Sequence, residues 1–227
     1  MIKDLKKEFE KNRLLFVEGE DDRRFFSKMS EKLELRKSLG IITLGGVTEW
    51  KVSLLSYIKS IRDNHNSIAF IRDADNDPLE AFNETRKVFL ESISNNSPLK
   101  ASVFPEYPES FSSSSPRIGV YILPTKNETG SLEDLCLQYF KKEKQKFPCA
   151  EEFFQCLKQK SKEKKTHENK KKLQSILLEV ELQSYLSSLE NNFSFAYTPG
   201  EATKKGYIDC SNDIFEDLKN FLLEFAK

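Results

Sequence analysis

The first residues that could do chemistry are acidic, and they lie where an apolar run ends. The segment LLFVEGEDD, residues 14–22, places four carboxylates in the five positions from Glu18 to Asp22. Repulsion and lost hydration disfavour such a cluster in its ionised form unless a positive charge lies nearby. The chain must therefore supply a cationic side chain at this point or bind a cation.

A second acidic group follows a later apolar run, in the segment IRDADND at residues 71–77. Asp73 ends this run, and Asp75 and Asp77 follow it at two-residue steps. Helix capping could account for Asp22, and an Asx-rich turn could account for Asp75 and Asp77. Asp73, at the end of a buried strand, has no such local role, so we expect it to be functional.

A third acidic group lies in GSLEDLCL, residues 130–137. Ser131 and Asp134 have the spacing of a capping box, which predicts a structural role for Asp134. Glu133 lies elsewhere on the predicted helix, and it could join the other acids if that helix begins beside a strand end. Otherwise we expect Glu133 to be a surface residue.

Four continuous apolar runs predict the strands that would position these acids: LLFV, IITL, IAFI and IGVYIL, at residues 14–17, 41–44, 68–71 and 118–123. Helix-forming segments separate the first three runs. This alternation is typical of an α/β fold with a mainly parallel sheet that is covered on both faces. Since ligands bind at the carboxyl ends of such strands, Glu18 and Asp73 are expected to meet at one edge of the sheet. Converging carboxylates are suitable ligands for a hard divalent cation such as Mg²⁺ or Mn²⁺.

Beyond the fourth apolar run, which ends at residue 123, the sequence predicts helices. Between residues 104 and 116 the composition shifts to Pro, Ser and Glu, which indicates a mobile loop or a hinge. We expect an α/β core over residues 1–145 and a helical extension, packed on that core, over residues 146–227. The lysine-rich segment 158–172 is either a phosphate-binding surface or a solvated helix face or connection.

Composition restricts the class of protein. The chain has 227 residues, with 36 basic and 36 acidic side chains that cancel, so no global charge draws it to nucleic acid or to a membrane. No apolar run approaches the roughly 20 residues that span a bilayer, and the N-terminus lacks the apolar centre of a signal peptide. We therefore expect a soluble, cytoplasmic protein without a membrane partner.

VEGEDD with a later DAD resembles the Toprim domain of topoisomerases, primases and OLD-type nucleases. The segments LLFVEGEDD, ITLGG, FIRDADND, VYILP, GSLEDLCL and GEATKKGY are similar, in that order, to a prokaryotic Toprim-related family of unknown function. The resemblance covers nearly the whole chain and implies a four-stranded Toprim-like sheet. It also implies Glu18 as metal ligand or acid/base, and Asp73 and Asp75 as ligands of Mg²⁺. Asp22 matches the acid that follows VEG in OLD-type enzymes.

The late element of this resemblance contains Lys204 and Lys205, either of which could face a phosphate or simply lie in solvent. The chain also departs from the larger Toprim proteins. It has no GxxxxGK[ST] loop, so the ATPase of OLD proteins is not expected. It has no zinc module like that of primases and no sign of a nucleophilic tyrosine domain, so priming and strand transfer are not expected either.

Three functions remain open. The first is a Mg²⁺-dependent phosphodiesterase that acts on DNA or RNA with Glu18, Asp73 and Asp75 at its centre, helped by Asp22, Asp77 or Glu133. The second is a non-catalytic module that binds nucleic acid or a nucleotide, or that regulates a protein partner; an exposed apolar helix face would indicate such a partner or a homodimer. The third is a small-molecule phosphatase, which is disfavoured because the first strand ends in VEG and not in a nucleophilic aspartate.

Overall fold

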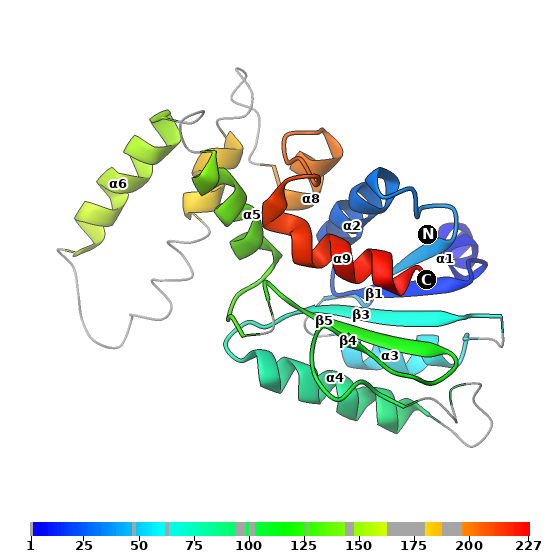
Figure 1. The fold of residues 1–227 in the computed structure, drawn as a ribbon. Coiled ribbons are helices and arrows are strands. Elements are labelled where there is room, and N and C mark those ends of the chain that lie inside the picture. The colour runs from blue at the N-terminus through cyan, green and yellow to red at the C-terminus, as the bar shows by residue number, and fades with distance from the viewer. Residues whose placement is uncertain are drawn as a thin grey trace.

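A computed structural model gives this chain an α/β fold, in which one mainly parallel sheet lies between two layers of helices (Figure 1). The structure describes residues 2–46, 49–61, 64–93, 99, 103–125, 127–143, 148–162, 180–187 and 197–227. Most of the lysine-rich segment 158–172 lies outside the described residues. No helix of the described chain is long and apolar enough to cross a membrane.

The sheet has five strands in the order β2-β1-β3-β5-β4. Their bounds are Arg13–Val17 (β1), Leu39–Thr43 (β2), Ser67–Asp73 (β3), Ser110–Phe111 (β4) and Arg117–Leu123 (β5). The four strands predicted from apolar runs are confirmed, and their mutual pairing is parallel. The predicted count of four is one too low, because β4, which pairs antiparallel with β5, lies in the Ser-rich stretch that predicted a loop or hinge.

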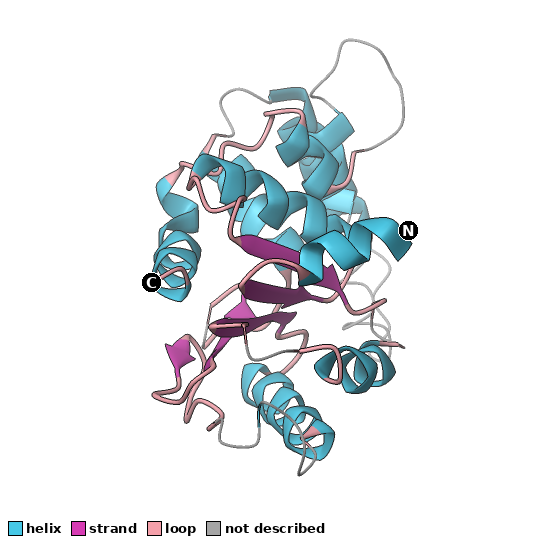
Figure 2. Cartoon of the chain, turned by 90° about the vertical axis from the view of Figure 1, so that its right-hand side faces the viewer, coloured by secondary structure: helices cyan, strands magenta, loops and turns pink. Residues whose placement is uncertain are grey.

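Helices cover both faces of the sheet, as Figure 2 shows from the side. The helices are α1 (Ile2–Phe9), α2 (Glu20–Lys32), α3 (Trp50–Ile58), α4 (Pro78–Ser92), α5 (Leu132–Lys142), α6 (Pro148–Lys162), α8 (Pro199–Lys204) and α9 (Glu216–Phe225), with a 3₁₀ turn at Asp213–Phe215. Residues 180–187 are helical as well. One hydrophobic cluster joins the sheet to α2, α5, α8 and α9, and a second joins it to α3 and α4. The C-terminal helices therefore complete one face of the sheet.

The alternation of side chains along β1 and β3 decides which residues share a face. Phe16 and Phe70 lie on the face of α3 and α4, where their rings stack with centroids 5.5 Å apart. Val17 pairs with Ile71, and both pack on the opposite face. Because side chains alternate between faces, Glu18 is expected on the α3/α4 face and Asp73 on the other.

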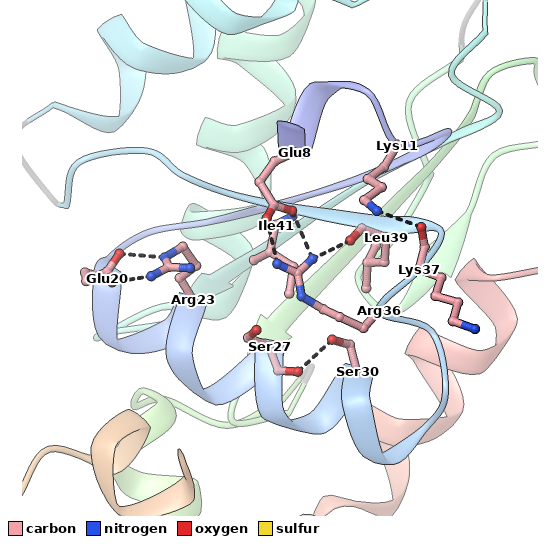
Figure 3. Close-up of polar contacts among 10 residues, drawn as sticks. All are labelled: Glu8, Lys11, Glu20, Arg23, Ser27, Ser30, Arg36, Lys37, Leu39 and Ile41. Atoms are coloured by element: carbon pink, nitrogen blue, oxygen red, sulfur yellow. Dashed lines mark hydrogen bonds and ion pairs between the residues drawn. The ribbon is translucent and has the colours of Figure 1, made fainter. Parts of the chain in front are cut away.

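The outer strand β2 is covered by α1 (Figure 3). Both carboxylate oxygens of Glu8 accept hydrogen bonds from Arg36, at 2.6 and 3.0 Å, and Oε2 also accepts one from the backbone N–H of Ile41 at 3.0 Å. Gly40 permits this close packing, since a Cβ there would lie 2.2 Å from the backbone oxygen of Glu8. The edge of the sheet is thus partly protected from pairing with another strand.

Candidate metal centre

Four carboxylates lie within electrostatic reach of one another at the carboxyl ends of β1 and β3. Glu18 follows β1, Asp22 lies in the first turn of α2, Asp73 ends β3, and Glu133 lies in the first turn of α5. Burial, and after it the charges of Glu133 and Glu18, raise the pKa of Asp22 to about 7 against the opposing hydrogen bond from Gly19. Four of the six acidic residues that the sequence proposes as metal ligands therefore lie in one group, which we call the acidic group.

Asp73 has the same electrostatic environment as Asp22. Burial raises the pKa of Asp73 well above its ordinary value, and the charges of Asp22, Glu18 and Glu133 add to this effect. A hydrogen bond of 3.0 Å from the backbone N–H of Leu132 to Oδ1 acts in the opposite direction. Asp73 thus lies between the end of its own strand and the start of α5.

Glu18 differs from the other three because it has a cationic partner. Arg72 donates from Nε to Oε1 of Glu18 over 2.8 Å, and the exposed fractions of the two side chains are only 7% and 9%. The guanidinium also lies over the ring of Trp50, with its carbon 4.0 Å from the centroid. The first acidic residue of VEGEDD is therefore compensated from within the chain.

The remaining acids of VEGEDD have separate structural roles. Glu20 accepts two hydrogen bonds from Arg23, at 2.5 and 2.7 Å (Figure 3). Asp21 holds the start of α8, because it accepts hydrogen bonds from Thr198 Oγ1 and, at 2.9 Å, from the backbone N–H of Gly200. The crowding of charge in this segment is thus resolved by giving each carboxylate different partners.

Asp22 closes the N-terminal turn of α2. Its Oδ2 accepts a hydrogen bond of 2.8 Å from the backbone N–H of Gly19, the residue that precedes the helix. This is the capping role that the sequence left open for Asp22. The carboxylate combines that role with a place in the acidic group, since capping uses one of its two oxygens.

The DADND segment contributes to the site mainly through its backbone. Asp75 and Gly130 exchange two backbone hydrogen bonds of 2.9 Å, which join the end of β3 to the start of α5. The side chain of Asp75 is exposed, and its backbone φ is +49°. Asp77 is exposed as well, and its Oδ1 accepts from the backbone N–H groups of Leu79 and Glu80 at 2.9 and 3.0 Å, so it caps α4.

The start of α5 behaves as its sequence predicts. Asp134 accepts a hydrogen bond of 2.9 Å from the backbone N–H of Ser131, which confirms the capping box. Glu133 is half-buried and is one of the charges that raise the pKa values of Asp22 and Asp73. The first turn of α5 therefore has one structural and one candidate functional acid.

Lys204 and Lys205 are both exposed at the end of α8. The ammonium group of Lys205 bonds to Tyr197 Oη and lies over that ring, 4.2 Å from its centroid. This contact of Lys205 is with an aromatic residue that precedes α8. Thr48, whose side chain is of a type that caps helices, lies outside the described residues, and Glu49 precedes α3.

The donor chemistry of the group fits a hard divalent cation. All four side chains offer carboxylate oxygens, which Mg²⁺ prefers, and among the described residues only Glu18 of the four forms an ion pair. As they stand, however, no three His, Cys, Asp or Glu side chains of the described chain are placed to hold a metal ion. A bound cation would therefore require movements of these side chains, and it would relieve the repulsion between them.

The structure adds one residue to the site that sequence reasoning missed. Arg72 lies in the same IRDADND segment as Asp73. The alternation of side chains along the strand, combined with the register of β1 and β3, is the signal that could have identified it. Val17 pairs with Ile71, so the next positions, Glu18 and Arg72, are expected to be cross-strand neighbours on one face. Before the register of β1 and β3 was known, Asp73 was the residue expected to meet Glu18 at the edge of the sheet.

Comparisons with known proteins give one result. No curated protein and no solved structure is significantly similar to the chain. A family model described as "Protein of unknown function (DUF3226)" matches residues 12–227, which is all of the chain beyond α1 and the turn that follows it. The chain therefore belongs to the DUF3226 family.

Proposed function

We propose that this protein is a Mg²⁺-dependent phosphodiesterase of the Toprim-like class that acts on DNA or RNA. The observation that carries the proposal is the gathering of Glu18, Asp22, Asp73 and Glu133 at the carboxyl ends of two neighbouring parallel strands. Such an edge is where ligands bind in open α/β sheets. Burial first, and then the neighbouring carboxylates, raise the pKa values of Asp22 and Asp73, and a divalent cation would neutralise the negative charge gathered there.

Each residue has a role in the proposal. Asp22, Asp73 and Glu133 would hold the cation, with Glu18 beside them, while the exposed side chain of Asp75 would stay outside this group. A bound Mg²⁺ would supply an activated water and would stabilise charge on the phosphoryl group. Glu18 is fixed by Arg72 and would either contact the cation or move a proton at Oε2.

The test is an assay of the full chain on single- and double-stranded DNA and RNA with Mg²⁺ or Mn²⁺. Asp73→Asn and Glu18→Gln are expected to lower the rate at least 100-fold, about the effect of removing a group that binds or protonates in the transition state. Asp217→Asn is the matched control, because Asp217 is an exposed acid on α9. Equal activity in all three variants would identify a contaminating nuclease and reject the proposal.

The same group of carboxylates also suits a second function. A cation-dependent binding module that lacks turnover would use Asp22, Asp73 and Glu133 in the same way, because binding a cation requires no acid/base residue. Nucleic acid, a nucleotide or a protein would then be the partner. This alternative would be favoured if calorimetry showed saturable Mn²⁺ binding that Asp73→Asn weakens, while the wild type cleaved no phosphodiester.

A further inference from the structure

Arg72 is held from three directions that do not involve the acidic group. Its Nη1 donates to the backbone oxygen of Ala81 and to Thr85 Oγ1, each at 3.3 Å. Its guanidinium lies 4.0 Å from the ring centroid of Trp50, and Glu84 Oε2 lies 3.6 Å from Nη1. Helices α3 and α4 thus fix the plane of the guanidinium.

This fixed guanidinium in turn fixes Glu18. Nε of Arg72 binds Oε1 of Glu18 at 2.8 Å, while Oε2 takes no hydrogen bond from the described part of the chain. An arginine suits this task better than a lysine, because its planar fork can bond a carboxylate while it stacks on an aromatic ring. One oxygen of Glu18 is therefore held and the other is available.

Strand β3 carries both Arg72 and Asp73 at its carboxyl end, and successive residues of a strand point to opposite faces. The same short segment thus supplies the residue that orients Glu18 and a carboxylate of the acidic group. We infer that Arg72 is the positioning residue of the site, which holds Glu18 by Oε1 so that Oε2 can serve a divalent cation. This inference rests on the proposed function, because it assumes that the four carboxylates bind such a cation.

The inference makes a directional statement about metal affinity. If Arg72 were only a repelling positive charge, its removal would tighten the binding of a divalent cation. If Arg72 positions Glu18, its removal weakens binding, because a buried carboxylate without its partner does not keep its place. Residues that orient a metal ligand typically change metal affinity by about 10- to 100-fold when they are replaced.

The experiment is calorimetric titration of the full chain with Mn²⁺, comparing wild type with Arg72→Met, Arg72→Lys, Glu18→Gln and the double variant Glu18→Gln/Arg72→Met. We expect Arg72→Met to weaken Mn²⁺ binding by about 10-fold or more. Arg72→Lys keeps the charge but loses the fork, so it should also weaken binding. In the Glu18→Gln background, Arg72→Met should change the affinity less than about twofold, since Arg72 acts through Glu18.

Arg36→Met is the matched control. Arg36 forms a two-bond pair with Glu8 at the β2 edge, so its replacement breaks a comparable ion pair outside the acidic group. It should leave the Mn²⁺ affinity unchanged. Circular dichroism checks that each variant folds. If Arg72→Met does not fold, the comparison uses Arg72→Lys and the double variant Glu18→Gln/Arg72→Lys in its place.

The outcomes separate this inference from the proposed function. If Glu18→Gln weakens Mn²⁺ binding while both Arg72 variants bind as tightly as wild type or more tightly, the positioning role is rejected and the metal site stands. An equal loss from Arg72→Met in the wild-type and Glu18→Gln backgrounds also rejects it. If wild type does not bind Mn²⁺, or if Glu18→Gln has no effect, the proposed metal site fails and the role of Arg72 fails with it.

Discussion

Replacing Asp22 by asparagine should stabilise the metal-free protein at neutral pH and much less at acidic pH. The pKa of Asp22 rises from its ordinary value of 3.8 to about 7 in the folded chain, first through burial and then through Glu133 and Glu18. Because the folded-state pKa lies above the unfolded one, the folded state keeps a proton between pH 4 and 7 that the unfolded state has lost. The wild type therefore loses stability as the pH rises through this window.

The magnitude follows from the width of that window. One pKa unit corresponds to about 1.4 kcal/mol, so from pH 5 to a folded-state pKa of about 7 the wild type should lose about 3 kcal/mol. Asparagine does not ionise, and its side-chain oxygen can still accept the hydrogen bond from Gly19. The free energy of unfolding of Asp22→Asn, minus that of wild type, should thus increase by about 3 kcal/mol from pH 5 to pH 8.

Urea denaturation at pH 5, 6, 7 and 8 in the presence of EDTA measures this difference directly. Asp217→Asn, at an exposed position of α9, is the control for the loss of one carboxylate outside the acidic group. Millimolar Mn²⁺ at pH 8 should reduce the advantage of Asp22→Asn, because a bound cation stabilises the ionised aspartate. A difference that stays constant or shrinks between pH 5 and pH 8 in EDTA would refute the description of Asp22 as a half-buried member of an acidic group.

Three further substitutions test separate parts of the structure. Gly40→Ala should lower the free energy of unfolding by about 1 to 3 kcal/mol in urea, because the new Cβ would meet the backbone of α1; an unchanged midpoint would show that α1 does not pack there. Asp21→Ala should cost about 1 to 3 kcal/mol through the N–H of Gly200 left unbonded, with no change in calorimetric Mn²⁺ affinity; a tenfold weaker affinity would instead make Asp21 a ligand. Asp75→Asn should bind Mn²⁺ as wild type does, since the exposed side chain of Asp75 lies outside the acidic group and asparagine tolerates its positive φ; a loss equal to that of Asp73→Asn would contradict this.

The framework of the fold could be predicted because its signals are strong and local. Continuous apolar runs such as LLFV and IAFI are buried on both faces, and the structure pairs them as neighbouring parallel strands. The segment DIFEDLKNFLLEF likewise spaces its apolar residues along one helix face: Leu218, Phe221, Leu222 and Phe225 are buried and Ile214 is half-buried. Strand β4 gave no such signal, because it is two residues long and lies among serines.

The site could be predicted only in part, because its geometry depends on strand register and not on local pattern. Asp73 and Glu18 both end strands, yet the pairing of Val17 with Ile71 makes Arg72 the cross-strand neighbour of Glu18. In the sequence, Asp75 and Asp77 could belong either to the metal group or to an Asx-rich turn. The chain turns directly after β3, so Asp75 takes a left-handed backbone conformation and Asp77 caps α4.

The most direct test of the central claim is the anomalous signal of Mn²⁺ in crystals of the full chain. The account predicts a peak at about 2.1 to 2.2 Å from oxygens of Asp73 and Asp22, with Glu133 or Glu18 beside it. A Mn²⁺ peak bound elsewhere, with these four carboxylates in unchanged contacts, would contradict the claim that they form a metal centre.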